Sequence, residues 1–462
     1  MGAPRAIRVA WLALAATVAL VAGLLVVPDA DAREKLSTVK GADGPGPAQY
    51  DKVTVNKIGP KKAGNVLVLI PGTIGGAGDF TLIARDLVAR TPGLQVWAID
   101  RRSQAFEDTS MFERALAGEA TPQEAFDYYL GWLLNPAITE RFQPLDESTV
   151  PFARKWGMKV ALRDVRKVVR KAGARGRNVV LGGHSLGASL AAAYTAWDFK
   201  GKPGYKGLDG LVLIDGGLLG SFDRLTLAEA KAALAELEAG SPFTDLLGIG
   251  LPWSAGIFAE LGALYAKADP KGRSSLQDSP LLPPAFKPPV DVTNRALLGY
   301  AFDKTTSPEG LALIQVRAGR LQDSGDPRDW KDGEVTPLRR LRNLFAQEPV
   351  NAVEWYFPQR LSIDSSGANA MRRNEVTDYL GLRLFHSRKV DVPLYAIQTD
   401  LTDGGVLRGA RAFIKRTKTG PKEATLIDSS GNKSHLDPLT ASRKKNDLVK
   451  TLPGFLDAHL PD

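Results

Sequence analysis

The chain has 462 residues, 44% hydrophobic and 24% charged, so it can fill a large core but exceeds an average domain, and we expect two domains or one with a large insertion. The net charge of +9 is scattered, which is typical of a solvated basic surface; nucleic acid is not an expected partner, and association with an anionic cell envelope is the alternative. The lack of cysteine excludes disulfides, thiolate metal sites, a cysteine nucleophile and a lipidated cysteine.

The N-terminal segment has the pattern of a secretory signal. Two arginines within the first eight residues precede an apolar stretch over residues 9–27, and Ala30 and Ala32 follow at the small-residue positions of a cleavage site. We therefore expect residues 1–32 to be removed and the protein to be secreted or held in the cell envelope. The alternative is an uncleaved anchor, because the stretch is just long enough to span a bilayer. In both cases the folded part lies outside the cytoplasm.

A buried parallel sheet is predicted after a short leader. Residues 33–50 are charged and rich in glycine and proline, which is typical of a flexible leader. Six short apolar runs follow, each continuous rather than alternating, as in strands covered on both faces. Helical patterns between several of them predict an α/β fold with a doubly wound, mostly parallel sheet. The runs cover residues 65–72, 94–102, 178–185, 208–217, 392–400 and 423–431.

The regular alternation of strand and helix stops between residues 217 and 390. This stretch contains no convincing strand, but Thr226 and Glu229 form a capping box that predicts the start of a helix. A mostly helical inserted domain is therefore expected here. The domain boundaries that follow are a core at 51–217 and 391–462 and an inserted domain at 218–390. The inserted domain has an apolar part at 243–266, and a smaller irregular insertion lies near 103–157.

Ser185 lies in a tight turn between a strand and a helix. Leu181 ends the buried strand and Ala188 begins an alanine-rich helix, so the chain must reverse within a few residues. The residue at the apex is forced toward positive φ, and its neighbours two positions away come very close. Gly183 and Gly187 occupy those two positions. The turn therefore lifts the Ser185 hydroxyl clear of the backbone at the carboxyl edge of the sheet.

The sequence Gly183-His184-Ser185-Leu186-Gly187 between these elements resembles the nucleophile elbow of the α/β-hydrolase superfamily. The N–H of Leu186, at the start of the helix, would stabilise an oxyanion. The resemblance implies a second donor in the loop after an earlier strand. Thr73 is the candidate there and Ile74 is the next, although proline stands where the family often has histidine.

The resemblance also implies a histidine base and an acid. Of four histidines, His435 follows the last apolar run on a polar loop, where the family carries its base. The family most often places the acid after the preceding strand, where this chain offers Asp403, which we favour, and Asp400. Asp215, at the end of an earlier strand, is the outside alternative, since some members use that strand. The order Ser185, Asp403, His435 matches the family.

These candidates predict acyl transfer through a serine. The resemblance also implies that the inserted domain at 218–390 is a cap or lid, whose apolar part would either line an acyl pocket or form its own core. With the expected compartment, this resemblance indicates a secreted carboxylic ester hydrolase, esterase- or lipase-like, acting on a small-molecule or lipid-like ester without a cofactor or metal. One alternative is an acyltransferase that acts on cell-envelope acceptors. Another is a binding protein on an inactive hydrolase scaffold.

Overall fold

A computed structural model describes residues 34–347 and 350–460. The predicted signal at residues 1–32 lies outside the described residues. No helix within the described ranges is both long and apolar enough to cross a membrane.

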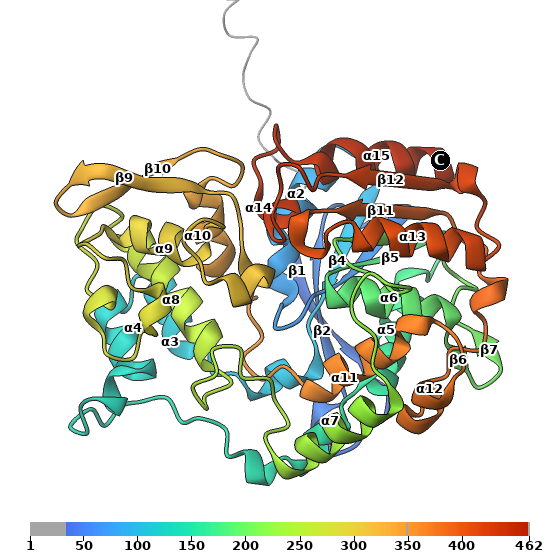
Figure 1. Cartoon of the computed structure of the whole chain (residues 1–462), viewed down its shortest axis with the longest axis horizontal. Helices are drawn as coiled ribbons and strands as arrows, with labels where there is room; N and C mark the ends of the chain where they lie inside the picture. Colours follow the sequence, from blue (N-terminus) through green and yellow to red (C-terminus); the bar gives the residue numbers. More distant parts are fainter. Residues whose placement is uncertain (1–33, 348–349, 461–462) are drawn as a thin grey trace, which may run out of the picture.

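The core is an eight-stranded sheet in the order β1-β2-β4-β3-β5-β8-β11-β12 (Figure 1). All six predicted apolar runs are strands, and the six pair in parallel. Two further strands, β1 and β2, pair antiparallel at one edge. The prediction of a doubly wound, mostly parallel α/β sheet is confirmed. The strands are β1 Glu34–Lys40, β2 Lys52–Ile58, β3 Asn65–Ile70, β4 Leu94–Ile99, β5 Asn178–His184, β8 Gly210–Ile214, β11 Leu394–Gln398 and β12 Ala424–Asp428.

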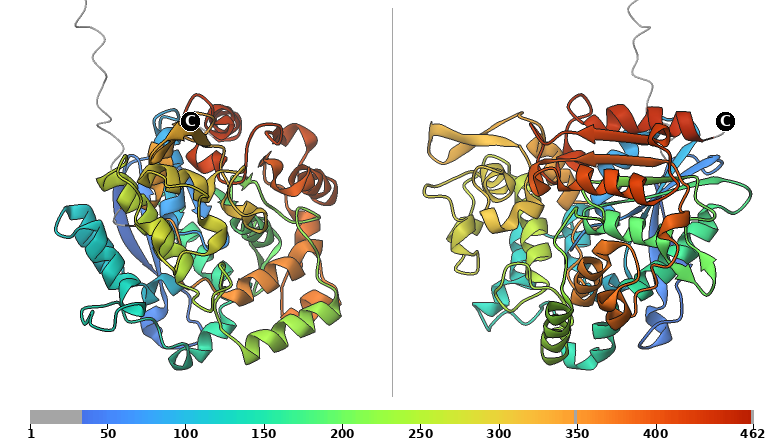
Figure 2. Two further views of the ribbon diagram at one scale, coloured as in Figure 1. Left: turned by 60° about the vertical axis from the view of Figure 1, so that its left-hand side comes forward. Right: turned by 45° about the vertical axis from the view of Figure 1, so that its right-hand side comes forward.

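Helices cover both faces of this sheet because the parallel strands are apolar on both sides. On one face α2 (Thr81–Val88) contacts α15 (Asp447–His459), and elsewhere α5 (Met158–Ala172) contacts α6 (Leu186–Ala196). Helix α13 (Gly405–Arg416) packs on β11 and β12, on the side opposite α15 (Figure 2). The sheet is therefore sandwiched, and its carboxyl edge is left for the loops.

The expectation of a flexible leader at residues 33–50 is wrong for the described part, residues 34–50. Strand β1 pairs along its whole length with β2, and the glycine-rich stretch behind it is held by side chains from distant elements. Asp164 accepts the Ala42 N–H at 2.7 Å, and Arg102 donates to the Ala42 carbonyl at 3.0 Å. Buried Arg102 also pairs with Asp51 and Asp164, both at 2.7 Å. The stretch looks flexible in sequence because these partners lie far along the chain.

Most of the regular secondary structure between β8 and β11 is helical, and α7 begins after Thr226 with its capping box formed, as predicted. The expectation of no strand is wrong, because β9 (Gly319–Gly325) and β10 (Arg328–Asp332) form a hairpin. Only Trp330 of these strands is buried, so the hairpin contains no apolar run from which a strand could be predicted. The helices are α7 Leu227–Ala239, α8 Ser254–Ala268, α9 Asn294–Phe302, α10 Leu338–Phe345, α11 Gln359–Gly367 and α12 Glu375–Leu380.

This segment is divided between two places in the molecule. Helices α8, α9 and α10 and the hairpin form a lobe beside the core (Figure 1). The insertion near 103–157, expected to be irregular, supplies α3 (Ser110–Ala117) and α4 (Pro122–Tyr129), which pack on α8 in the same lobe. Helices α7, α11 and α12 contact one another, and α11 lies against α5 and α6 of the core. The lobe thus draws on two separate insertions.

Candidate active site

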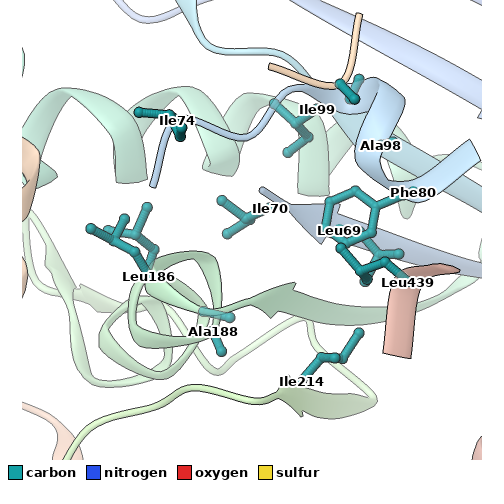
Figure 3. Packing of buried hydrophobic residues seen from close by; sticks show 14 of the residues in the cluster. Leu69, Ile70, Ile74, Phe80, Ala98, Ile99, Leu186, Ala188, Ile214 and Leu439 are labelled. Carbon is teal, nitrogen blue, oxygen red and sulfur yellow. The ribbon is translucent and has the colours of Figure 1, made fainter. Parts of the chain in front are cut away.

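The turn at Ser185 has the strained geometry that the sequence predicts. Ser185 has φ 55° and ψ −125° between the end of β5 and the start of α6. A Cβ on Gly183 would lie 2.3 Å from the Gly187 carbonyl carbon, and one on Gly187 would lie 2.0 Å from the Ile70 oxygen. Ala188, in the first turn of α6, belongs to the same buried cluster as Ile70 (Figure 3). Glycine is therefore required on both sides of the serine.

The end of β5 is tied to the end of β8. The Ser185 N–H donates to the Ile214 carbonyl at 2.9 Å, which extends the register in which His184 faces Ile214. A Cβ on Gly216 would lie 2.1 Å from the backbone carbonyl oxygen of Ser185, so the chain after β8 passes directly behind the serine. Asp215, between Ile214 and Gly216, is consequently a neighbour of the turn.

A buried carboxylate–imidazole pair lies at this edge. His435 Nδ1 donates to Asp215 Oδ2 at 2.6 Å, and the two side chains are 1% and 0% exposed. The Thr399 N–H donates to Asp215 Oδ1 at 2.6 Å, and the Thr399 hydroxyl donates to Oδ2. Burial alone would raise the pKa of Asp215, but the hydrogen bonds and charge of His435 and the bonds from Thr399 outweigh it and lower the pKa. Asp215 therefore stays ionised and orients His435, leaving Nε2 free to accept a proton.

The favoured acid, Asp403, is a wrong prediction. Asp403 is exposed at φ 45°, and its contact is through the backbone, where its carbonyl accepts Arg408 at 2.7 Å. Asp400 pairs with Lys304 and with Arg317, the latter at 3.1 Å. After β11 the residue that faces the site is Thr399, which binds Asp215. The outside alternative, Asp215, is the acid that the structure brings to His435.

His184 holds the loop that carries His435. Its ring lies 4.4 Å from the His435 ring, and its Nε2 donates to the His435 carbonyl at 3.0 Å. Burial, together with the nearby His435, lowers the pKa of His184 to about 3, so His184 is neutral. Ser185 Oγ makes no hydrogen bond within the described ranges, to His435 or to any other group. Such bonds often form only when substrate closes the site.

The two expected oxyanion donors line one cavity with Ser185. Thr73 and Leu186 both line it, and neither N–H donates to another described residue. Leu186 N–H opens α6, where the helix dipole favours negative charge. Ile74, the next candidate, has φ 51°, and its carbonyl accepts the Glu354 N–H at 2.7 Å. Two free N–H groups thus flank the serine.

Sequence reasoning missed Arg101, which holds the Thr73 turn. Its guanidinium donates to the carbonyls of Gly72 at 2.9 Å, Gly75 at 3.0 Å and Pro71, and pairs with buried Glu354 at 2.6 Å. With those carbonyls turned toward Arg101, the intervening N–H groups are free to face the cavity. An arginine directly after a buried strand, in the run "IDRR", was the available signal.

Two cavities adjoin at Thr73 and Leu313, which line both of them. The first, about 750 Å³, is lined by Ser185 and by polar groups that include Asp223 and Arg408. The second, about 110 Å³, is almost wholly apolar and runs into the lobe. Six of its lining residues come from the 243–266 stretch: Leu246, Leu247, Ala255, Phe258, Ala259 and Gly262. That stretch thus lines a pocket as well as packing the lobe.

The order of the strands, the strained serine after β5 and the Asp215–His435 pair at the carboxyl edge are together typical of one fold. This chain has the α/β-hydrolase fold. No model of a known protein family matches the sequence, and no curated protein matches it.

Within the described ranges, no three side chains of His, Asp or Glu lie close enough together to hold a metal ion.

Solved structures of several enzymes are similar to this chain at low identity. An epoxide hydrolase from Vigna radiata is 11% identical, with a TM-score of 0.43 over 92% of this chain and 98% of its own. A soluble variant of monoglyceride lipase from Saccharomyces cerevisiae is 13% identical, with a TM-score of 0.40 over 93% and 96%. A thioesterase domain from the curacin biosynthetic pathway is 12% identical, with a TM-score of 0.40 over 92% and 99%.

Proposed function

We propose that this chain is a serine hydrolase that cleaves carboxylic esters through an acyl-enzyme on Ser185. One observation carries the proposal: the strained serine lies beside a buried Asp215–His435 pair and lines a polar cavity that shares Thr73 and Leu313 with an apolar one. An isolated buried carboxylate would be costly, so its full set of hydrogen bonds argues for a built site rather than a chance contact.

The reaction uses these groups in turn. His435 Nε2 takes the proton of the Ser185 hydroxyl as Oγ attacks the ester carbonyl, and the ionised Asp215 stabilises the imidazolium. The N–H groups of Leu186 and Thr73 hold the negative oxygen. The intermediate collapses, and His435 returns the proton to the leaving alcohol. Water then attacks the acyl-enzyme by the same route and releases the acid.

The two cavities assign the two halves of the substrate. The apolar cavity suits the acyl chain and the polar cavity suits the alcohol. The apolar cavity, about 110 Å³, is the smaller of the two, and we infer that it takes an acyl chain of medium length.

Export is part of the proposal. The arginines, apolar stretch and alanines of the first 32 residues support a secreted or envelope-bound enzyme. N-terminal sequencing of protein recovered outside the cytoplasm tests it. A mature N-terminus at residue 33 supports cleavage, an intact N-terminus in the membrane fraction supports an anchor, and recovery in the cytoplasm alone refutes export.

A fluorophosphonate probe and p-nitrophenyl esters of two to sixteen carbons test the chemistry. The wild type should label and should hydrolyse esters of about eight carbons best, whereas Ser185→Ala should do neither. Ser189→Ala is the matched control, because Ser189 lines the same cavity but donates to the Gly217 carbonyl. Equal labelling of wild type and Ser185→Ala would refute the site, and no labelling of either would favour a binding protein.

The polar cavity supports a second candidate, an acyltransferase. It is larger than the apolar one and its wall includes Asp223, Asn369, Asp403 and Arg408, which can hydrogen-bond a polyol. The acyl group would then pass to an acceptor hydroxyl instead of water. Product analysis with added glycerol or glucose distinguishes the two: an acylated acceptor formed in preference to free acid indicates transfer.

A further inference from the structure

Asp79 places a carboxyl group in the wall of the apolar cavity. It lies in the 3-10 turn Ala77–Phe80 that follows the Thr73 turn, and it is 7% exposed. Every other described residue that lines this cavity is uncharged, and nearly all of them are apolar. A Cβ on Gly75 would lie 2.3 Å from Asp79 Oδ2, so glycine at position 75 leaves the space that the carboxyl fills.

This carboxyl has no hydrogen-bond partner among the described residues. Its backbone N–H donates to the Gly76 carbonyl, but neither carboxyl oxygen takes part in a hydrogen bond or an ion pair. Arg101 is near enough to act on it electrostatically, yet makes its hydrogen bonds to the turn carbonyls and its ion pair to Glu354. Buried polar groups are nearly always satisfied, so this carboxyl, which has no protein partner and lines the cavity, is available to a polar group of a ligand bound there.

Burial favours the neutral form of this carboxyl. Burial raises the pKa of Asp79 well above its ordinary value, the neighbouring Asp100 raises it further, and the pull of Arg101 does not cancel these effects. A protonated carboxyl offers one O–H donor and acceptor oxygens. A hydroxyl is the substituent that both accepts from the donor and donates to an acceptor, whereas a ketone or ether can only accept.

The position of Asp79 fixes where that hydroxyl must be. Gly75 ends the turn whose N–H bonds back to Gly72, with Thr73 between them, and the ends of such a turn lie within about 7 Å. An ester oxygen held at Thr73 N–H therefore places the first carbons of its acyl chain beside Gly75 and Asp79. Leu436, next to His435, also lines this cavity, as do lobe residues such as Phe286.

We propose that Asp79 selects acyl chains that carry a hydroxyl group within the first few carbons of the ester carbonyl, so that the substrates are esters of hydroxylated fatty acids. This rests on the proposed ester hydrolysis. The carboxyl acts as a specificity-determining group, binding the hydroxyl in the ground state and in the transition state. A site built to hydrogen-bond a hydroxyl discriminates against the analogue that lacks it, because its own polar group is then left unpaired.

A set of methyl octanoates tests the proposal: the parent ester and the isomers hydroxylated at carbon 3, 5 or 7, with acid release followed in a pH-stat. The wild type should show a kcat/KM at least about 10-fold higher for one isomer near the carbonyl than for the parent. Asp79→Ala should abolish that ratio, and Asp79→Asn, which keeps a donor and an acceptor, should retain part of it. Leu246→Ala, which removes an apolar wall group, should leave the ratio intact.

A binding measurement keeps the proposal independent of turnover. In the Ser185→Ala background the preferred hydroxyoctanoate ester should raise Tm more than methyl octanoate does, and adding Asp79→Asn should narrow the difference. Equal kcat/KM for all four esters in the wild type, or a preference that survives Asp79→Ala, would overturn the role of Asp79 while leaving ester hydrolysis standing. If the wild type cleaves no ester, binds none and is not labelled by the fluorophosphonate probe, then both ester hydrolysis on Ser185 and the role of Asp79 are refuted.

Discussion

Replacing Asp215 by asparagine removes the charge that orients His435 and keeps the shape of the side chain. The amide oxygen of the new side chain would accept the Thr399 N–H, and its NH2 group would then face the Thr399 hydroxyl and His435 Nδ1. To accept from that NH2 group, His435 must move its proton to Nε2. Nε2 could then no longer take the proton of Ser185.

The size of the effect follows from burial. The Asp215 and His435 side chains are 0% and 1% exposed, so solvent screens their interaction little. Two unit charges about 4 Å apart interact by about 4 kcal/mol at an effective dielectric constant of about 20. At about 1.4 kcal/mol per decade this is a loss in kcat of about 1000-fold. If Asp215 served only to stabilise the fold, an Asp215→Asn protein with an unchanged Tm would show a much smaller loss in kcat.

The assay is kcat and KM for p-nitrophenyl octanoate, with Tm as the control for folding. Asp403→Asn and Asp400→Asn are the matched controls and should stay within about threefold of wild type, because neither acid contacts His435. If Asp403→Asn loses activity by orders of magnitude while Asp215→Asn is mild, the assignment of the acid is wrong.

Three further changes probe the support of the site. Arg101→Lys keeps the charge opposite Glu354 but loses carbonyl contacts, so kcat should fall about 10-fold or more with little change in KM; an unaltered kcat would show that the Thr73 turn needs no such support. Gly187→Ala places a Cβ 2.0 Å from the Ile70 oxygen, and urea unfolding should show a loss of about 3 kcal/mol or more together with lost probe labelling. Burial raises the pKa of Asp100 from 3.8 to about 7, so the folded state keeps a proton that the unfolded state releases, and stability falls as pH rises between those values by about 4 kcal/mol. Asp100→Asn should remove that component of the pH dependence of unfolding, and an identical dependence in both proteins would contradict it.

The local sequence pattern predicted the structure correctly where all the residues that fix an element lie in one short segment. The strand β5, the glycines at 183 and 187 and the alanines of α6 lie within a single stretch, so the strain at Ser185 is set by its own neighbours. Continuous apolar runs likewise predict strands that are buried on both faces, and all six were correct. The loop position of His435 could also be read from its place after the last run.

Hairpin β9–β10 and strand β1 show where local pattern fails. Both are largely exposed and polar, so neither has an apolar run, and each is fixed by pairing with a partner strand. The lobe is a stronger case, because α3 and α4 pack on α8 from a separate insertion. Sequence spacing could not show that two insertions build one lobe.

By itself the sequence predicted the candidate nucleophile, its turn and the parallel sheet, because each depends on residues adjacent along the chain. Only the tertiary structure chose Asp215 over Asp403, brought Arg101 under the Thr73 turn and left Asp79 facing the apolar cavity. Those choices depend on which strand ends and loops meet at the carboxyl edge of the sheet, and on which of several equivalent carboxyl groups the packing turns inward. The spacing of residues along the sequence does not show which of these strand ends and loops lie together.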